Sequence, residues 1–110
     1  MRKIEEIVQE LIDTHNTKSP FEICKNLGIN VTYADLPDSV SGFIVEILKK
    51  KVVVINISMP DDEKLLTCAH ELGHILLHEG INYINAHGRD EEIMNLEKEA
   101  DYFSYCLCNE

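Results

Sequence analysis

Basic residues are scarce in this chain. Lys and Arg total 10 against 20 Asp and Glu, which gives a formal net charge of -10. An excess of negative charge repels phosphate backbones, so direct nucleic-acid binding is not expected. The same charge favours approach to a basic partner, although an acidic surface also serves solubility alone.

The chain also lacks a long apolar run and a recognisable cysteine spacing. A membrane-spanning helix needs about 20 consecutive apolar residues, and no segment has a run of nearly that length. The first six residues have no apolar core suited to a signal peptide. The four cysteines fit neither a disulfide framework nor a Cys-x-x-Cys pair; they are Cys24, Cys68, Cys106 and Cys108. These absences predict reduced thiols, a cytoplasmic location and no membrane partner.

Internal repeats, linkers and low-complexity segments are absent as well. A length of 110 residues with 45% hydrophobic residues suits one packed domain and is too short for two. We therefore expect a single domain over residues 1–110.

Hydrophobic periodicity predicts an α+β fold in which a small sheet packs against four helices. Apolar residues recur at helical spacing over residues 2–16 and 91–107, a capping box begins a short helix over 20–27, and acidic residues begin a helix over 61–80. β-Branched runs predict strands over 29–33, 43–48 and 52–57, and breaker residues predict a loop over 81–90. The last two strands form a hairpin with Lys49, Lys50 and Lys51 as its turn, so the three-stranded sheet is expected to be mainly antiparallel.

The helix over residues 61–80 carries His-Glu-x-x-His, the signature of helical zinc hydrolases. Residues four apart on a helix differ by about 40° in direction, so His70 and His74 face the same way and can take two corners of a zinc tetrahedron. Glu71, about 100° around from His70, reaches the open side where a water molecule would bind. Gly73 costs a helix interior about 1 kcal/mol, which predicts that another backbone comes close there.

A catalytic zinc usually has three protein ligands and one water, so a third ligand must come from elsewhere. On the last helix, Glu97 and Glu99 flank the same apolar stripe on opposite sides, and periodicity alone does not choose between them. The spacing to Asp101 favours Glu97, because Asp101 lies one turn along on the same flank and could accept the outer N–H of a ligand histidine. His78 lies about 12 Å along the axis from His70. We therefore expect His78 to pack or to act behind the ligands rather than to bind the same metal.

The segments His70–His78 and Glu97–Phe103 resemble the ImmA/IrrE family of metallopeptidases. The family pattern is His-Glu-hydrophobic-Gly-His-x-x-x-His, followed by Glu-x-x-Ala-Asn/Asp-x-Phe, and the resemblance extends upstream to a helical start and a small sheet with a hairpin. It implies one Zn2+ ion per chain, with His70 and His74 as ligands, Glu97 as the third ligand and Glu71 as the catalytic base. The ligand set His, His, Glu also suits Mn or Fe.

The resemblance further implies a phage, mobile-element or bacterial endopeptidase that cleaves a helix-turn-helix repressor and so releases transcription. In this hypothesis Glu71 takes a proton from a zinc-activated water as it attacks the scissile carbonyl, and then passes the proton to the leaving amine. The hydrogen-bond donor that would stabilise the oxyanion is not determined by the sequence; the candidates are Tyr83, His87, Tyr102 and Tyr105.

Two other functions compete with the peptidase. Family members commonly continue past the last helix, whereas this chain ends at Glu110, so we expect recognition elements carried in such an extension to be missing. This motivates the alternative of a zinc-containing regulatory module that binds a repressor without efficient proteolysis. A structural zinc protein needs four closed protein ligands, and neither a cysteine nor His78 is well placed to be the fourth.

Overall fold

The computed structural model describes residues 3–78 and 90–109. Its helices are α1 (Ile4–His15), α2 (Pro20–Asn26), α3 (Asp61–Leu77) and α4 (Asp90–Cys108), and its strands are β1 (Asn30–Ala34), β2 (Gly42–Ile47) and β3 (Lys50–Asn56). The α+β class, the four helices and the three-stranded sheet are therefore confirmed. The predicted helix over 61–80 is too long, because α3 ends at Leu77 and His78 is already outside the helix. The predicted loop up to residue 89 lies outside the described residues, and Asp90 already belongs to α4. None of the helices in the described part of the chain is long and apolar enough to cross a membrane.

The sheet is mixed, with strand order β1-β3-β2. β2 and β3 pair antiparallel as the predicted hairpin, whereas β1 pairs with β3 in parallel, from Asn30 opposite Val52 to Ala34 opposite Asn56. The connection after β1 crosses the position of β3 and leads into β2 at the far edge of the sheet. β2 runs opposite to β1, and the hairpin then returns the chain so that β3 runs in the same direction as β1. A pattern that is local in sequence predicts the hairpin but not this non-local parallel pairing.

The hairpin turn consists of Leu48 and Lys49, with φ angles of 51° and 67°. Two-residue hairpin turns favour positive φ at both positions, because that geometry matches the right-handed twist of the strands. The prediction of a three-lysine turn is wrong for Lys50 and Lys51, which already pair with β2. Alternating side chains of β3 then reach the core, with Val53 and Ile55 fully buried.

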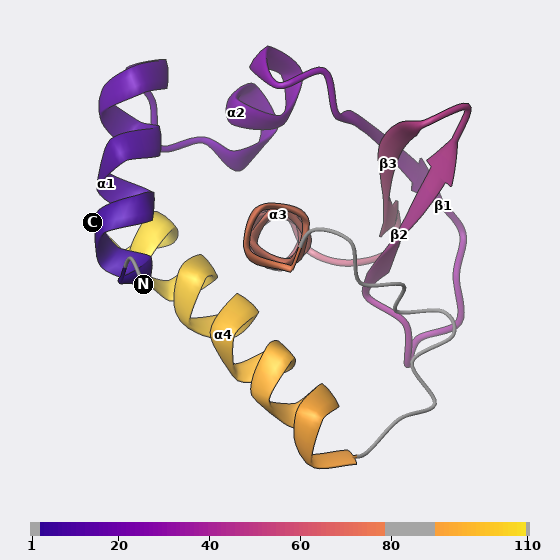
Figure 1. Cartoon of the computed structure of the whole chain (residues 1–110). Coiled ribbons are helices and arrows are strands. Elements are labelled where there is room, and N and C mark those ends of the chain that lie inside the picture. Colours follow the sequence, from indigo (N-terminus) through magenta and orange to yellow (C-terminus); the bar gives the residue numbers. More distant parts are fainter. Residues whose placement is uncertain (1–2, 79–89, 110) are drawn as a thin grey trace.

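α3 is the central element of the molecule. Figure 1 looks along its axis and shows it between the sheet and the other three helices. Its residues Cys68, Ala69 and Leu72 are fully buried. Around them lie buried residues from every other layer: Val8, Ile23, Cys24, Val53, Ile55, Phe103 and Leu107. Burial of such side chains stabilises the fold by about 1.5–3 kcal/mol each. The helix that carries the His-Glu-x-x-His motif is therefore held in place by buried side chains of the sheet and of the other helices.

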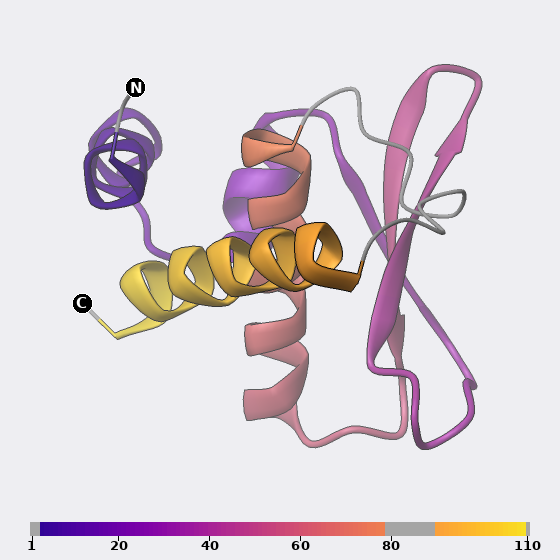
Figure 2. The ribbon, with the colours of Figure 1, turned by 60° about the horizontal axis from the view of Figure 1, so that its bottom comes forward.

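α4 crosses α3 at Gly73 (Figure 2). A Cβ atom at Gly73 would lie 3.0 Å from Cγ and Cδ1 of Phe103, a ring on the buried face of α4. The prediction that another backbone comes close at Gly73 is therefore wrong, because the group that approaches is the side chain of Phe103. Because Glu97 lies six residues before Phe103, this crossing carries the first half of α4 over the histidines of α3.

Asn56, at the end of β3, fastens the segment that leads into β2. Its side-chain amide nitrogen lies 3.0–3.3 Å from three backbone carbonyl oxygens of residues 36–40, and its Oδ1 accepts a hydrogen bond from the backbone N–H of Ser58. Its backbone N–H donates to the carbonyl of Ser41. Asn56 is 2% exposed, so these bonds hold Ser41 and Gly42 in place beside α3.

Candidate metal centre

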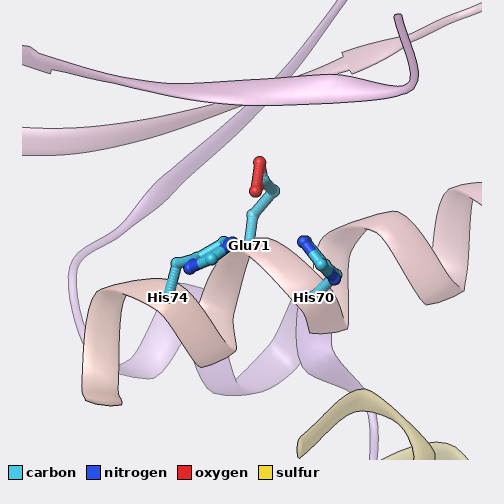
Figure 3. A group of neighbouring side chains, drawn as sticks. All are labelled: His70, Glu71 and His74. Atoms are coloured by element: carbon cyan, nitrogen blue, oxygen red, sulfur yellow. The ribbon is translucent and has the colours of Figure 1, made fainter. Parts of the chain in front are cut away.

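The two motif histidines stand side by side on α3. The ring centroids of His70 and His74 are 4.7 Å apart and the ring planes are nearly perpendicular. Figure 3 shows Glu71 rising from the same helix toward the sheet, next to both rings. Potential ligand atoms of these three side chains lie within 4.8 Å of one another, so the motif forms one compact group of donors that could hold a metal ion.

Glu97 on α4 faces both histidines at once. Its Oε2 lies 3.0 Å from Nε2 of His70, and its Oε1 lies 2.9 Å from Nε2 of His74. Periodicity alone did not decide whether Glu97 or Glu99 lies at the histidines. The crossing of α4 over α3 brings Glu97 to Nε2 of both rings. Glu99 instead contacts His78, with 2.7 Å between its Oε1 and Nε2 of the ring.

Two further contacts surround the pair of histidines. Nδ1 of His70 lies 2.7 Å from Oδ1 of Asp101, within ion-pair distance. Nδ1 of His74 lies 3.0 Å from Nδ1 of the buried His78. Asp101 and His78 therefore contact the Nδ1 atoms of the two motif histidines, whereas Glu97 contacts the Nε2 atoms of both.

The donor set at His70 fits a metal ion. Both ring nitrogens face a carboxylate oxygen, at 2.7 Å for Asp101 and 3.0 Å for Glu97. A neutral imidazole carries only one N–H, so one nitrogen presents a lone pair to an acceptor oxygen. Such an arrangement is favourable only when a cation, either a proton or a metal ion, lies between nitrogen and oxygen.

The carboxyl of Glu71 is shielded from solvent, with 7% of the residue exposed. Burial raises its pKa to about 7, and the neighbouring negative charge of Glu97 acts in the same direction, whereas the charge of His70 lowers it. Burial also lowers the pKa of His74, which favours the neutral ring that a metal requires. A carboxyl whose pKa lies near neutrality suits proton transfer.

A cavity of about 690 Å³ opens onto the group. His70, Glu71 and Glu97 line it. The other lining residues come from α3, α4, the first residue of β2 and the residues next to these elements: Ser41, Gly42, Leu66, Thr67, Asp101, Ser104, Tyr105 and Asn109. The volume falls in the range of ligand-binding pockets, about 300–1,000 Å³. Glu71 is therefore buried from bulk solvent but still borders an open cavity.

The model of the IrrE N-terminal-like domain, a metallopeptidase family, matches residues 24–108 of this sequence. The chain belongs to the ImmA/IrrE family. It is also 35% identical over 79 residues to Uncharacterized immunity region protein 2 of Bacillus phage phi105, an alignment that covers 72% of this chain and 50% of the relative. The chain thus spans about half the length of that phage protein.

The sequence singled out the donors on α3 and Glu97, but it did not predict the contact between His78 and Glu99. The available signal was a third histidine four residues after His74, together with a carboxylate on the flank of α4 opposite Glu97. Of the four candidate oxyanion donors, Tyr105 lines the cavity. Tyr102 instead donates a hydrogen bond to Oε2 of Glu5, 2.9 Å away, and Tyr83 and His87 lie outside the described residues.

Proposed function

We propose that the chain is a zinc-dependent endopeptidase that cleaves a helix-turn-helix repressor and so derepresses transcription. The observation that carries this proposal is the convergence of Nε2 of His70 and Nε2 of His74 on the single carboxylate of Glu97, at 3.0 and 2.9 Å. The buried carboxyl of Glu71 lies beside this group. Two imidazoles, one carboxylate and a free carboxyl at an open cavity match the composition of catalytic zinc sites in peptidases.

His70, His74 and Glu97 would hold one Zn2+ ion, and the same set of donors also suits Mn or Fe. When bound, the metal would supply Lewis-acid chemistry to a peptide carbonyl and a water molecule. Asp101, 2.7 Å from Nδ1 of His70, would accept the outer N–H of that ring and keep its orientation. His78 would act on the outer nitrogen of His74, 3.0 Å away.

Glu71 is the proposed base and acid of the reaction. Its carboxyl lines the cavity, and burial raises its pKa, which favours the uptake and later release of a proton. It would take the proton of the attacking water and hand it to the leaving amine. Tyr105, which lines the same cavity, is the proposed hydrogen-bond donor to the developing oxyanion.

The proposed substrate is a basic helix-turn-helix repressor of a phage or mobile element, met in the cytoplasm. A basic partner is attracted by a net charge of -10, and the relative from phage phi105 is named for an immunity region. The four cysteines are free thiols, as in a reducing compartment. We propose that residues 1–110 form a single catalytic domain.

Metal analysis combined with a cleavage assay tests this function. Wild-type protein purified without chelator should carry about one zinc per chain, which His70→Ala and Glu97→Ala should lose and Glu71→Gln should largely retain. Glu92→Gln, a change at an exposed position on α4, is the matched control. A wild-type chain that holds no metal and takes none up would overturn the proposed site.

Co-incubation with the cognate repressor, followed by mass spectrometry, separates proteolysis from binding. Wild type and Glu92→Gln should produce a specific fragment, and Glu71→Gln should not. If Glu71→Gln still relieves repression without cleavage, binding alone suffices and the chain is a zinc-containing regulatory module. That outcome would leave the metal site standing and overturn the enzymatic proposal.

A further inference from the structure

A chain of three polar contacts runs from the surface of α4 to the centre of the site. Oε1 of Glu99 lies 2.7 Å from Nε2 of His78, Nδ1 of His78 lies 3.0 Å from Nδ1 of His74, and Nε2 of His74 lies 2.9 Å from Oε1 of Glu97. His74 and His78 are 3% and 6% exposed. The two rings are therefore shielded from solvent between two carboxylates.

We propose that Glu99 and His78 are positioning residues that fix the tautomer of His74 for metal binding, an inference that rests on the proposed function. An ionised carboxylate can only accept a hydrogen bond, so Nε2 of His78 carries the proton that faces Glu99. A neutral imidazole has one N–H, so Nδ1 of His78 is an acceptor. Nδ1 of His74 must then donate, and the lone pair on its Nε2 is left facing the position where Nε2 of His70 and the carboxylate of Glu97 converge.

The opposite proton arrangement would block the site. If His78 carried its proton on Nδ1, His74 would accept there and would carry its own proton on Nε2, the nitrogen that must face a metal. Nε2 of His78 would then present a lone pair to the carboxylate of Glu99 at 2.7 Å, which is unfavourable. In the metal-binding tautomer, the lone pair on Nε2 of His74 faces Oε1 of Glu97 at 2.9 Å, a repulsion that a metal ion bound between them would remove. With the metal bound, Glu99 thus favours this tautomer of His74 without touching it.

The backbone holds the intermediate ring where this requires it. α3 ends at Leu77, yet the backbone N–H of His78 still donates to the carbonyl of His74, at 2.9 Å. This last bond keeps His78 one turn from His74, on the same side of the helix. α4 therefore supplies a carboxylate for each motif histidine, Asp101 directly at His70 and Glu99 through His78.

Zinc affinity, measured by competition with a chromophoric chelator, tests the inference. Glu99→Ala and His78→Phe should each weaken zinc binding by about 10- to 100-fold, the usual effect of losing an outer partner of a ligand. The double variant should bind no more weakly than His78→Phe alone, because Glu99 acts through that ring. Glu99→Gln, which keeps an acceptor oxygen, should bind more tightly than Glu99→Ala, and the control Glu92→Ala should stay within about twofold of wild type.

The outcomes distinguish a failure of the positioning role from a failure of the proposed metal site. If Glu99→Ala binds zinc as Glu92→Ala does, or if the effects of Glu99→Ala and His78→Phe add in the double variant, the positioning role is wrong and the metal site stands. If the wild-type chain takes up no zinc, the proposed site is wrong and the positioning role falls with it. Should His78→Phe fail to fold in the metal-free state, the comparison of Glu99→Ala, Glu99→Gln and Glu92→Ala still decides, since Glu99 is exposed.

Discussion

Replacement of Gly73 by alanine should destabilise the protein, although alanine is the better helix former. The added Cβ would lie 3.0 Å from Cγ and Cδ1 of Phe103 and 3.1 Å from its Cβ. Phe103 is fully buried, so its ring has no open space to enter. Overpacking of this kind costs about 1–3 kcal/mol, whereas the change from Gly to Ala in a helix gains about 1 kcal/mol. The expected net result is a loss of up to about 2 kcal/mol in the free energy of unfolding.

Urea denaturation of the metal-free variants, followed by circular dichroism, measures this change. Phe103→Leu removes the ring that crowds the site, so Gly73→Ala should cost less in that background, and the double-mutant cycle gives the coupling. Zinc affinity should also fall in Gly73→Ala, because displacement of α4 moves Glu97 away from His70 and His74. A gain of about 1 kcal/mol, the helix-propensity gain alone, without coupling to Phe103 would refute the reasoning.

Three further predictions concern the stability of the fold and the effect of zinc on it. Asn56→Ala should lower the free energy of unfolding by about 1–3 kcal/mol, because it leaves three partly buried carbonyls of residues 36–40 without their donor; equal denaturation midpoints for Asn56→Ala and the exposed control Asn95→Ala would contradict this. Leu48→Asn combined with Lys49→Gly should raise stability by about 1 kcal/mol, because both positions have positive φ, and an unchanged or lower Tm would count against the turn geometry. Zinc at 100 times its Kd should stabilise the chain by about 2.7 kcal/mol, seen as a rise in Tm that a chelator reverses; no response to zinc would argue against binding by the native state.

The local part of the site was predictable from the sequence. His70, Glu71 and His74 lie on one helix, and helical geometry alone determines that their side chains come together. The same holds for the capping box of α2, where the side chain of Ser19 accepts a hydrogen bond from the backbone N–H of Glu22. In each case residues within one turn of each other settle the outcome.

The non-local part was not predictable from periodicity. Whether Glu97 or Glu99 meets the histidines depends on how α4 crosses α3, and that crossing is set by the contact of Phe103 with Gly73, 30 residues earlier. The sequence signals the close approach through a glycine inside a helix, but it does not say which group approaches. The parallel pairing of β1 with β3 has the same origin, because strands separated by a long connection carry no local signal of their direction.

The central claim is that one metal ion is held by His70, His74 and Glu97. Anomalous diffraction at the zinc edge, from crystals grown with one equivalent of zinc, tests it most directly. A single anomalous peak is expected within bonding distance of Nε2 of His70, Nε2 of His74 and the carboxylate of Glu97, at about 2.0–2.2 Å from each ligand atom. A zinc peak bound elsewhere on the chain, with Glu97 still in direct contact with both histidines, would contradict it.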